Sequence, residues 1–240
     1  MIKASVHIPI SNSGSPVKLP ADLSIPINST GIIIFAHGSG SGKNSPRNVA
    51  VAELLNKDGL ATLLVDLLTP EEEKCDTITA NQHNRIPGLI LNKFNIYLLT
   101  SRLLGVTEWV TQNQNTSGLV LGYFGASTGT AAALNASSNS RTCKFVEAIV
   151  SRSGRPDLVG RIGLRLITIP TLFIVGGSDL PDVINWNKNA LQDIGSEKKK
   201  MMVVANATHL FEEHGTLEEV AKLASGWFRC YFQIKAHQSA

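Results

Sequence analysis

Short apolar runs alternate with longer mixed segments along this chain, and this alternation predicts an α/β fold. The runs at 3–10 and 17–26 are expected to form two edge strands. Further strands are predicted at 31–36, 60–67, 145–151 and 171–175, with two more around Leu119 and Met201. Helices are predicted between them at about 47–58, 94–113, 181–193 and 214–232, with another ending at Ser137.

The stretch 69–91 breaks the alternation because it is polar and has no clear periodicity. A lid, a substrate loop and a simple flexible connection are all consistent with it. The helix at 94–113 is amphipathic by contrast, with Ile96, Leu99 and Leu103 on one side. Neither an internal repeat nor a linker interrupts the pattern, so residues 1–240 are predicted to form a single domain.

Composition agrees with one large aliphatic core. The chain has 240 residues, of which 43% are hydrophobic and only 6% aromatic, which suits a parallel sheet buried on both faces. The formal net charge is only +3, and the one dense basic run, Lys198–Lys200, leads into a strand. We interpret that run as a solvated edge, so no nucleic-acid partner is expected.

Three cysteines, Cys75, Cys143 and Cys230, are an odd number without motif spacing, which is typical of reduced thiols in a cytoplasmic protein. The first residues lack the apolar core of a signal peptide, and no apolar run is long enough to span a membrane. The sequence therefore predicts a cytoplasmic protein without a membrane partner.

The most informative motif is the G-x-S-x-G at Gly125–Gly129, which follows an apolar run and precedes a segment of small residues. A strand, a sharp turn and a helix in this order hold the serine in a strained backbone conformation, with Oγ above the end of the sheet. Glycines two residues to either side are required because a Cβ there would collide with the neighbouring strand or helix. Ser127 is therefore the predicted nucleophile.

A serine hydroxyl needs a base to take its proton and a carboxylate to orient that base. With a nucleophile of this kind, the acid and then the histidine follow, each just beyond a later strand. Asp179 comes after the strand at 171–175 and a Gly-Gly turn, and His209 comes after the strand that begins at Met201. We assign Asp179 as the acid and His209 as the base.

Other residues compete for these roles. His214 lies five residues after His209 but is expected to open the last helix, and Asp182 is expected in the first turn of another helix. Asp66 ends a strand but precedes the serine, so we expect it to bind loop backbone groups. Taken alone, Asp179 is equally well explained as a turn residue.

Two backbone N–H groups are needed to bind the oxyanion, each worth about 3 kcal/mol. We assign the Thr128 amide, directly after the nucleophile, as one donor. The other is the Ser39 amide, to within one residue, in the glycine-rich turn after the strand at 31–36. His37 in the same turn is expected to brace the loop rather than transfer protons.

The loop at 151–157 follows a strand and should therefore open on the catalytic face. Arg155 or Arg152 in this loop is a candidate for binding a substrate carboxylate through paired hydrogen bonds. The alternative is that both arginines bind loop carbonyls or surface acids.

The segments His37–Gly40, Gly125–Gly129, Val175–Asp179 and Ala207–His209 together resemble the α/β-hydrolase superfamily and, within it, the dienelactone-hydrolase-like group. The resemblance covers most of the chain. It implies a mainly parallel eight-stranded sheet with helices on both faces, and hydrolysis of a carboxylic ester or lactone. Dienelactone hydrolase itself uses a cysteine nucleophile. Ser127 stands at the matching position here, which favours a serine esterase of related architecture.

Other functions fit parts of the sequence less well. A phosphate-binding loop at Gly38–Lys43 would need glycine in place of His37 and a hydroxyl residue in place of Asn44. Zinc binding by His209 and His214 would need the two histidines four positions apart on one helix, and they are five apart. A non-catalytic binding module, or a thioesterase or peptidase with the same triad, remains an alternative.

The predicted activity is hydrolysis of a small-molecule ester or lactone by Ser127, with neither a cofactor nor a metal. Neither the preferred acyl chain nor the oligomeric state follows from the sequence.

Overall fold

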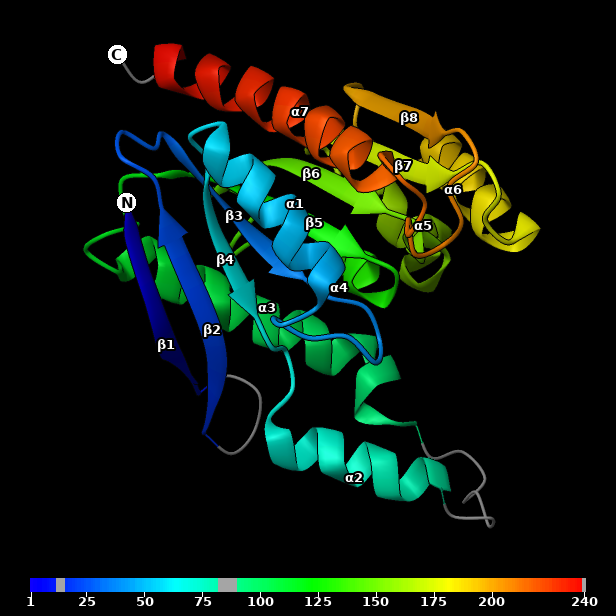
Figure 1. Cartoon of the computed structure of the whole chain (residues 1–240), viewed down its shortest axis with the longest axis horizontal. Coiled ribbons are helices and arrows are strands. Elements are labelled where there is room, and N and C mark those ends of the chain that lie inside the picture. The colour runs from blue at the N-terminus through cyan, green and yellow to red at the C-terminus, as the bar shows by residue number, and fades with distance from the viewer. Residues whose placement is uncertain (12–15, 82–89, 239–240) are drawn as a thin grey trace.

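The computed structural model describes residues 1–11, 16–81 and 90–238, and Figure 1 shows a central sheet with helices on both sides. The strands are β1 (Ile2–Ile10), β2 (Val17–Ile25), β3 (Gly31–Ala36), β4 (Ala61–Val65), β5 (Val120–Ala126), β6 (Val146–Arg152), β7 (Thr171–Gly176) and β8 (Lys199–Val204). Their order in the sheet is β1-β2-β4-β3-β5-β6-β7-β8. The β1–β2 and β2–β4 pairs are antiparallel and the other neighbouring pairs are parallel. The predicted eight-stranded, mainly parallel sheet is confirmed.

Two layers of helices cover the sheet. The helices are α1 (Pro46–Lys57), α2 (Pro70–Asn81), α3 (Ile96–Gln112), α4 (Thr128–Ser137), α5 (Gly160–Arg165), α6 (Pro181–Asp193) and α7 (Thr216–Gln238), with 3₁₀ turns η1 (Asn92–Phe94) and η2 (Pro156–Val159). Leu55 of α1 and Phe228 of α7 are buried in the core on one face. Leu103 of α3 and Ala190 of α6 belong to the core on the other face. Because β3 and β7 are buried along their whole length, their sequences are apolar throughout instead of alternating.

The pairing of β2 corrects one prediction. The strand at 17–25 is not an edge strand, because Ala21–Ser24 pair with β4 while the whole strand pairs with β1. The edges of the sheet are β1 and β8. Lys198, just before β8, and Lys200, at its start, are exposed. Lysines on an exposed edge hinder pairing with another chain, in line with the solvated edge expected there.

The expectation of an irregular segment at 69–91 is wrong for residues 70–81, which form α2. Thr69 and Glu72 cap this helix reciprocally: the Glu72 amide donates to Thr69 Oγ1 at 3.2 Å, and the Thr69 amide donates to Glu72 Oε2 at 2.8 Å. Glu72 Oε1 also accepts from Arg102 Nη2 at 2.7 Å, which ties α2 to α3. Residues 82–89, the remainder of the segment, lie outside the described residues.

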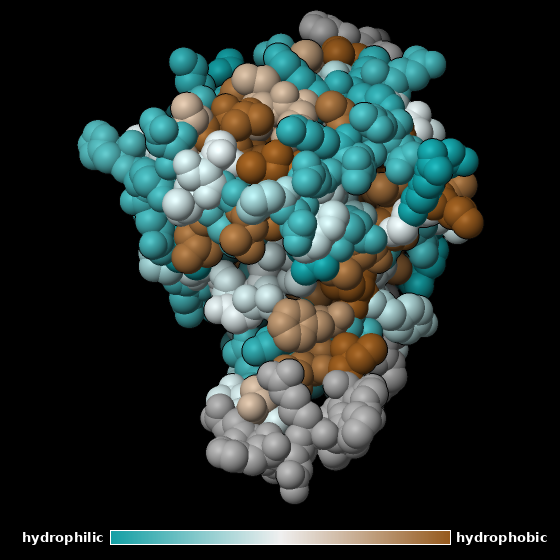
Figure 2. Space-filling model, turned by 90° about the vertical axis from the view of Figure 1, so that its right-hand side faces the viewer, coloured by the Kyte–Doolittle hydropathy of each residue, from teal (hydrophilic) through white to brown (hydrophobic). Residues whose placement is uncertain are grey.

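Smaller differences concern short elements and helix ends. The last helix begins at Thr216, so His214 precedes it instead of opening it. No element was predicted at 156–165, where η2 and α5 are too short to show a hydrophobic period. Over the described ranges, none of the helices combines the length and the apolar character needed to cross a membrane. Figure 2 shows the side of the molecule toward which β6 and β8 point, where hydrophobic side chains form separate patches among hydrophilic ones.

Candidate active site

Ser127 lies at the turn between β5 and α4, with φ 49° and ψ −122°. A positive φ is uncommon for a residue with a Cβ and costs of order 1–3 kcal/mol. The two flanking glycines make the turn possible. A Cβ on Gly125 would lie 2.6 Å from Cα of Thr130, and a Cβ on Gly129 would lie 2.0 Å from the carbonyl oxygen of Ala36. The local geometry is therefore the strained turn that the motif predicts, and the role of Ser127 as nucleophile stays a prediction.

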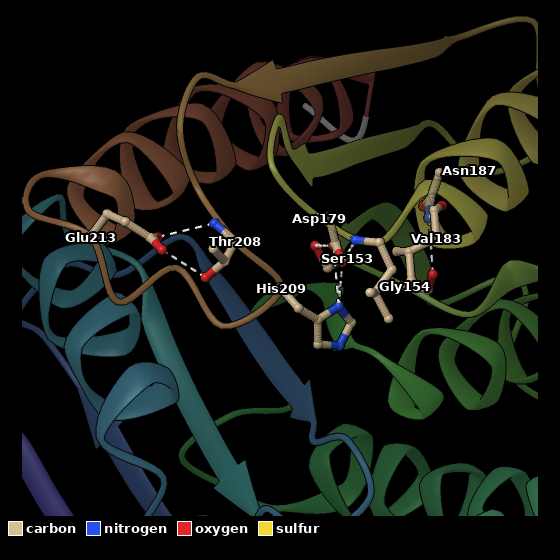
Figure 3. Close-up of polar contacts among 9 residues, drawn as sticks. Ser153, Gly154, Asp179, Val183, Asn187, Thr208, His209 and Glu213 are labelled. Atoms are coloured by element: carbon tan, nitrogen blue, oxygen red, sulfur yellow. Dashed lines mark hydrogen bonds and ion pairs between the residues drawn. The ribbon is translucent and has the colours of Figure 1, made fainter.

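Asp179 and His209 meet at the carboxyl end of the sheet. His209 Nδ1 lies 3.0 Å from Oδ1 and 3.1 Å from Oδ2 of Asp179, as Figure 3 shows. Asp179 follows β7 and His209 follows β8, and these two strands are parallel neighbours. The Asp179 side chain is 0% exposed, whereas that of His209 is 33% exposed. Nε2 of the ring points away from Asp179.

Donors other than His209 also hold the Asp179 carboxylate. Ser153 Oγ donates to Oδ2 at 2.5 Å, and the Leu180 amide donates to Oδ1 at 2.7 Å. Burial raises the pKa of Asp179, but the hydrogen bonds from His209 and Ser153, the charge of His209 and the Leu180 amide outweigh it, so the pKa lies below its ordinary value. An ionised carboxylate in this position favours the His209 tautomer with its proton on Nδ1.

Glu213 holds the loop that carries His209 through two hydrogen bonds to Thr208. The Thr208 amide donates to Glu213 Oε2 at 3.1 Å, and Thr208 Oγ1 donates to Oε1 at 2.7 Å (Figure 3). Hydrogen bonds from Thr208 hold the pKa of Glu213 below its ordinary value. Nothing in the spacing of these two residues marks them in the sequence, and their pairing was not predicted.

The glycine-rich loop after β3 lies against the nucleophile turn. A Cβ on Gly38 would be 2.9 Å from Cβ of Ser127, so this position must be glycine for the two segments to meet. The Ser39 amide donates to Thr128 Oγ1 at 2.9 Å. A substrate oxyanion would have to replace that hydroxyl as the acceptor of the Ser39 amide. Assignment of the Thr128 and Ser39 amides to the oxyanion hole stays a prediction.

His37 connects this loop to the end of β4. Its Nε2 accepts from the Leu67 amide at 3.0 Å, so Nδ1 carries the proton and donates to the Gly38 carbonyl at 3.0 Å. Burial lowers the pKa of His37, against smaller opposing effects of the Gly38 carbonyl and Asp66. A neutral, fully bonded imidazole has the bracing geometry expected from the sequence. Asp66 likewise binds backbone, accepting from the Lys43 amide at 2.6 Å.

Arg152, the last residue of β6, and Arg155, in the loop that follows, both bind other side chains of the protein. Arg155 donates to both carboxylate oxygens of Asp157, at 2.9 and 2.7 Å, and its guanidinium lies 4.1 Å from the ring centre of Trp186. Arg152 is buried and donates to Asn48 Oδ1 at 3.2 Å. Burial, with a smaller contribution from nearby Arg47, lowers the pKa of Arg152 to about 10. Asp157 occupies the Nε–Nη2 edge of Arg155, so this geometry matches the alternative in which the arginine binds a surface acid.

A pocket of about 480 Å³ lies against the glycine-rich loop after β3, and Ser127, Asp179 and His209 are not among its lining residues. Gly38, Ser39, Leu68 and Leu99 are among its lining residues, and α2 contributes Glu73. The described part of the 69–91 segment thus borders the pocket, and its role as a lid or substrate loop stays a prediction. Within the described ranges, no group of three or more His, Cys, Asp or Glu residues is arranged to hold a metal ion.

A sheet of this order, with a serine on the strand–turn–helix and an Asp–His pair after the last two strands, defines an α/β-hydrolase fold. Within that superfamily the chain belongs to the dienelactone-hydrolase-like family. It is 48% identical to a dienelactone hydrolase from Anabaena variabilis, over 95% of this chain and 98% of that one, with a TM-score of 0.83. Est1E from Butyrivibrio proteoclasticus shares the fold at 17% identity, with a TM-score of 0.72 over 95% of this chain and 100% of the other. No protein-family model matches the chain.

Curated relatives extend well beyond the region that this chain matches. Two proteins from strains of Mycobacterium tuberculosis are 50% identical over 213 residues, and both carry the name "Putative phosphoribosyl transferase". The match takes in 89% of this chain but 44% of each relative. The chain therefore spans less than half the length of the curated relatives it matches.

Proposed function

We propose that this chain is a serine hydrolase that cleaves a small carboxylic ester or lactone through an acyl-enzyme on Ser127. The observation that carries the proposal is the hydrogen-bonded Asp179–His209 pair, at the same end of the sheet as a serine held at φ 49°. Membership of a hydrolase family supports it.

In the proposed mechanism, His209 Nε2 takes the proton of Ser127 Oγ as Oγ attacks the carbonyl carbon. Ionised Asp179 keeps the imidazole in the correct tautomer and stabilises the imidazolium. The oxyanion is bound by the amides of Thr128 and Ser39. The Ser39 amide then donates to the oxyanion instead of to the Thr128 hydroxyl. His209 then protonates the leaving alcohol, and water hydrolyses the acyl-enzyme by the same route without a cofactor.

The pocket supports a small-molecule substrate. Its volume of about 480 Å³ lies in the range typical of ligand sites. Its lining combines the apolar Leu68 and Leu99 with charged side chains such as Glu73 and Lys93. A cytoplasmic location is part of the proposal, and it is supported by Cys75, Cys143 and Cys230, which are free thiols.

More than half of each Mycobacterium tuberculosis relative lies outside the region that this chain matches, so phosphoribosyl transfer is not proposed for this chain. The alternatives that remain are a thioesterase or peptidase with the same triad, and a binding module without catalysis.

The test is turnover of a panel of p-nitrophenyl esters, thioesters and lactones by the wild type and by Ser127→Ala. We expect ester or lactone hydrolysis that falls by about 10⁴-fold or more in the variant. Ser178→Ala is the matched control, because Ser178 is an exposed serine one residue before Asp179. Equal rates for wild type and Ser127→Ala would overturn the proposal, and preference for thioesters would favour the alternative substrate class.

A further inference from the structure

A second serine close to the active site has an unusual backbone conformation. Ser153 directly follows β6, has φ 40° and is 1% exposed. Its amide donates to the Ile174 carbonyl of β7 at 2.8 Å, so its backbone is fixed by the sheet. Its hydroxyl points at Asp179 and donates to Oδ2 at 2.5 Å (Figure 3). A non-glycine residue with positive φ persists only where its surroundings strongly determine it.

The Asp179 carboxylate has a distinct donor for each oxygen. The Leu180 amide binds Oδ1 and the Ser153 hydroxyl binds Oδ2, while His209 Nδ1 lies almost equally far from both oxygens. Because the Asp179 side chain is 0% exposed, solvent cannot reach Oδ2 to replace a lost donor. Without the Ser153 hydroxyl, the carboxylate would be free to turn toward the Leu180 amide and away from its symmetric contact with His209.

The residues on either side of Ser153 hold the nucleophile turn. The Ser127 amide donates to the Arg152 carbonyl at 3.2 Å, and the Arg155 amide donates to the Ser127 carbonyl at 3.0 Å. From α6, Asn187 Nδ2 donates to the Gly154 carbonyl at 2.9 Å, as Figure 3 shows. The segment 152–155 therefore contacts the backbone of the nucleophile and the side chain of the acid at once.

We propose that Ser153 is a positioning residue that holds Asp179 against His209 and fixes the acid relative to Ser127. This role rests on the proposed function, because it serves the same reaction. The Ser153–Asp179 contact itself can be measured whether or not the protein is a hydrolase, and the two questions are therefore separable.

The first test measures the contact through the pH dependence of stability. The Ser153 hydrogen bond lowers the folded-state pKa of Asp179 below its ordinary value of 3.8. The stability that the Ser153–Asp179 hydrogen bond contributes is therefore fully present above about pH 3.8, and it is lost as the pH falls through the folded-state pKa of Asp179. Among the described residues, His209 is the one titratable group that acts on the pKa of Asp179. His209 is therefore kept unchanged in every protein that is compared in this test.

We expect Ser153→Ala to lower Tm by roughly 4–8 °C at pH 7 and by clearly less near pH 3. For Ser153→Gly, the loss of Tm relative to wild type should likewise be smaller near pH 3 than at pH 7. Glycine accepts φ 40° without strain, so the part of its loss of Tm that does not depend on pH should differ from that of Ser153→Ala. Ser151→Ala is the matched control, since Ser151 is also buried on β6 but its hydroxyl bonds Thr130 Oγ1 at 3.1 Å. Its loss of Tm should be the same at both pH values.

The second test measures the rate at which a fluorophosphonate labels the protein at pH 7. Misplacement of the acid should slow labelling by roughly 10- to 100-fold in both Ser153→Ala and Ser153→Gly. The two variants both lack the hydroxyl, but only the glycine variant relieves the backbone strain. Equal losses of labelling rate would therefore be caused by the missing hydroxyl and not by a change in stability.

The outcomes separate the two proposals. The expected result is a difference in Tm between wild type and the Ser153 variants that is smaller near pH 3 than at pH 7, together with slow labelling of the variants. A difference in Tm that is equal at both pH values, or labelling of the variants at the wild-type rate, would overturn the positioning role of Ser153 while leaving the proposed function standing. Failure of the wild type to label at all would overturn the proposed function, and the difference in Tm would still show whether Ser153 controls Asp179.

Discussion

Nδ1 of His209 lies between the two carboxylate oxygens of Asp179, 3.0 Å from one and 3.1 Å from the other. This contact joins two loops that follow neighbouring parallel strands. It leaves Nε2 facing away from the acid. In an Asp–His pair of this geometry the acid sets the tautomer of the base, and the base becomes competent to accept a proton at Nε2.

Replacing Asp179 by asparagine should therefore impair catalysis far more than folding. An Asn amide that faces Nδ1 with its NH2 group donates a hydrogen bond instead of accepting one, so it holds the imidazole in the wrong tautomer, with the proton on Nε2. We expect Asp179→Asn to lower kcat/KM about 10⁴-fold at pH 7, measured on whichever ester the wild type turns over best. Asp182→Asn, in the first turn of α6, is the control and should retain the wild-type rate. A loss below tenfold for Asp179→Asn would argue against its role as the acid.

The close approach of Gly129 to β3 makes a second prediction, on stability. Gly129→Ala would place a Cβ 2.0 Å from a backbone oxygen, which cannot move without disturbing the sheet. We expect a loss of about 3 kcal/mol or more in the free energy of unfolding, measured with urea. Gly226→Ala is the counterpart, since Gly226 is exposed in α7 with no atom within 4 Å of an added Cβ. It should gain about 0.5–1 kcal/mol. Equal stabilities for the two variants would contradict this packing.

Two adjacent glutamates on α2 should respond in opposite ways to loss of charge. Glu72→Gln removes the carboxylate from Arg102, whose side chain is 2% exposed, and leaves a buried cation unpaired. We expect it to cost about 3 kcal/mol in urea denaturation. Burial and repulsion from Asp66 and Asp76 raise the pKa of Glu73, so Glu73→Gln should be neutral or slightly stabilising. If Glu72→Gln were as stable as Glu73→Gln, the link between α2 and α3 would be unimportant.

How far these features could be predicted from the sequence depends on the range of the interactions. Ser127, Asp179 and His209 were assigned because a serine in a strand–turn–helix motif is followed along the chain by the acid and then the histidine, each just beyond a later strand. The pocket-lining helix α2 was missed because its apolar periodicity is weak, although Thr69, Pro70 and Glu72 together are a helix-start signature.

Contacts between distant segments could not be predicted in the same way. The bond from the Ser39 amide to Thr128 Oγ1 spans 89 residues, and that from Ser153 to Asp179 spans 26. Both depend on the order of strands in the sheet, which a single sequence does not specify. The Arg155–Asp157 pair is only two residues apart, and it agrees with the alternative that the arginines bind loop carbonyls or surface acids.

The buried His37 should make stability depend on pH. Burial lowers its pKa in the fold from the ordinary 6.5, so the unfolded chain takes up a proton first as the pH falls. Stability should therefore decline below about pH 6.5, with a slope of up to about 1.4 kcal/mol per pH unit until the folded-state pKa is reached. Urea unfolding between pH 5 and 7.5 should show this slope in the wild type and not in His37→Asn. His7→Asn, at an exposed position on β1, should keep it.

The measurement that tests the central claim most directly is intact mass after exposure to a fluorophosphonate, with Ser127→Ala and His209→Ala alongside. An activated serine reacts once, so we predict a single adduct on the wild type, none on Ser127→Ala and a much slower reaction of His209→Ala. A folded wild type that forms no adduct, or an adduct that persists in Ser127→Ala, would contradict the account and favour a binding module on the same fold.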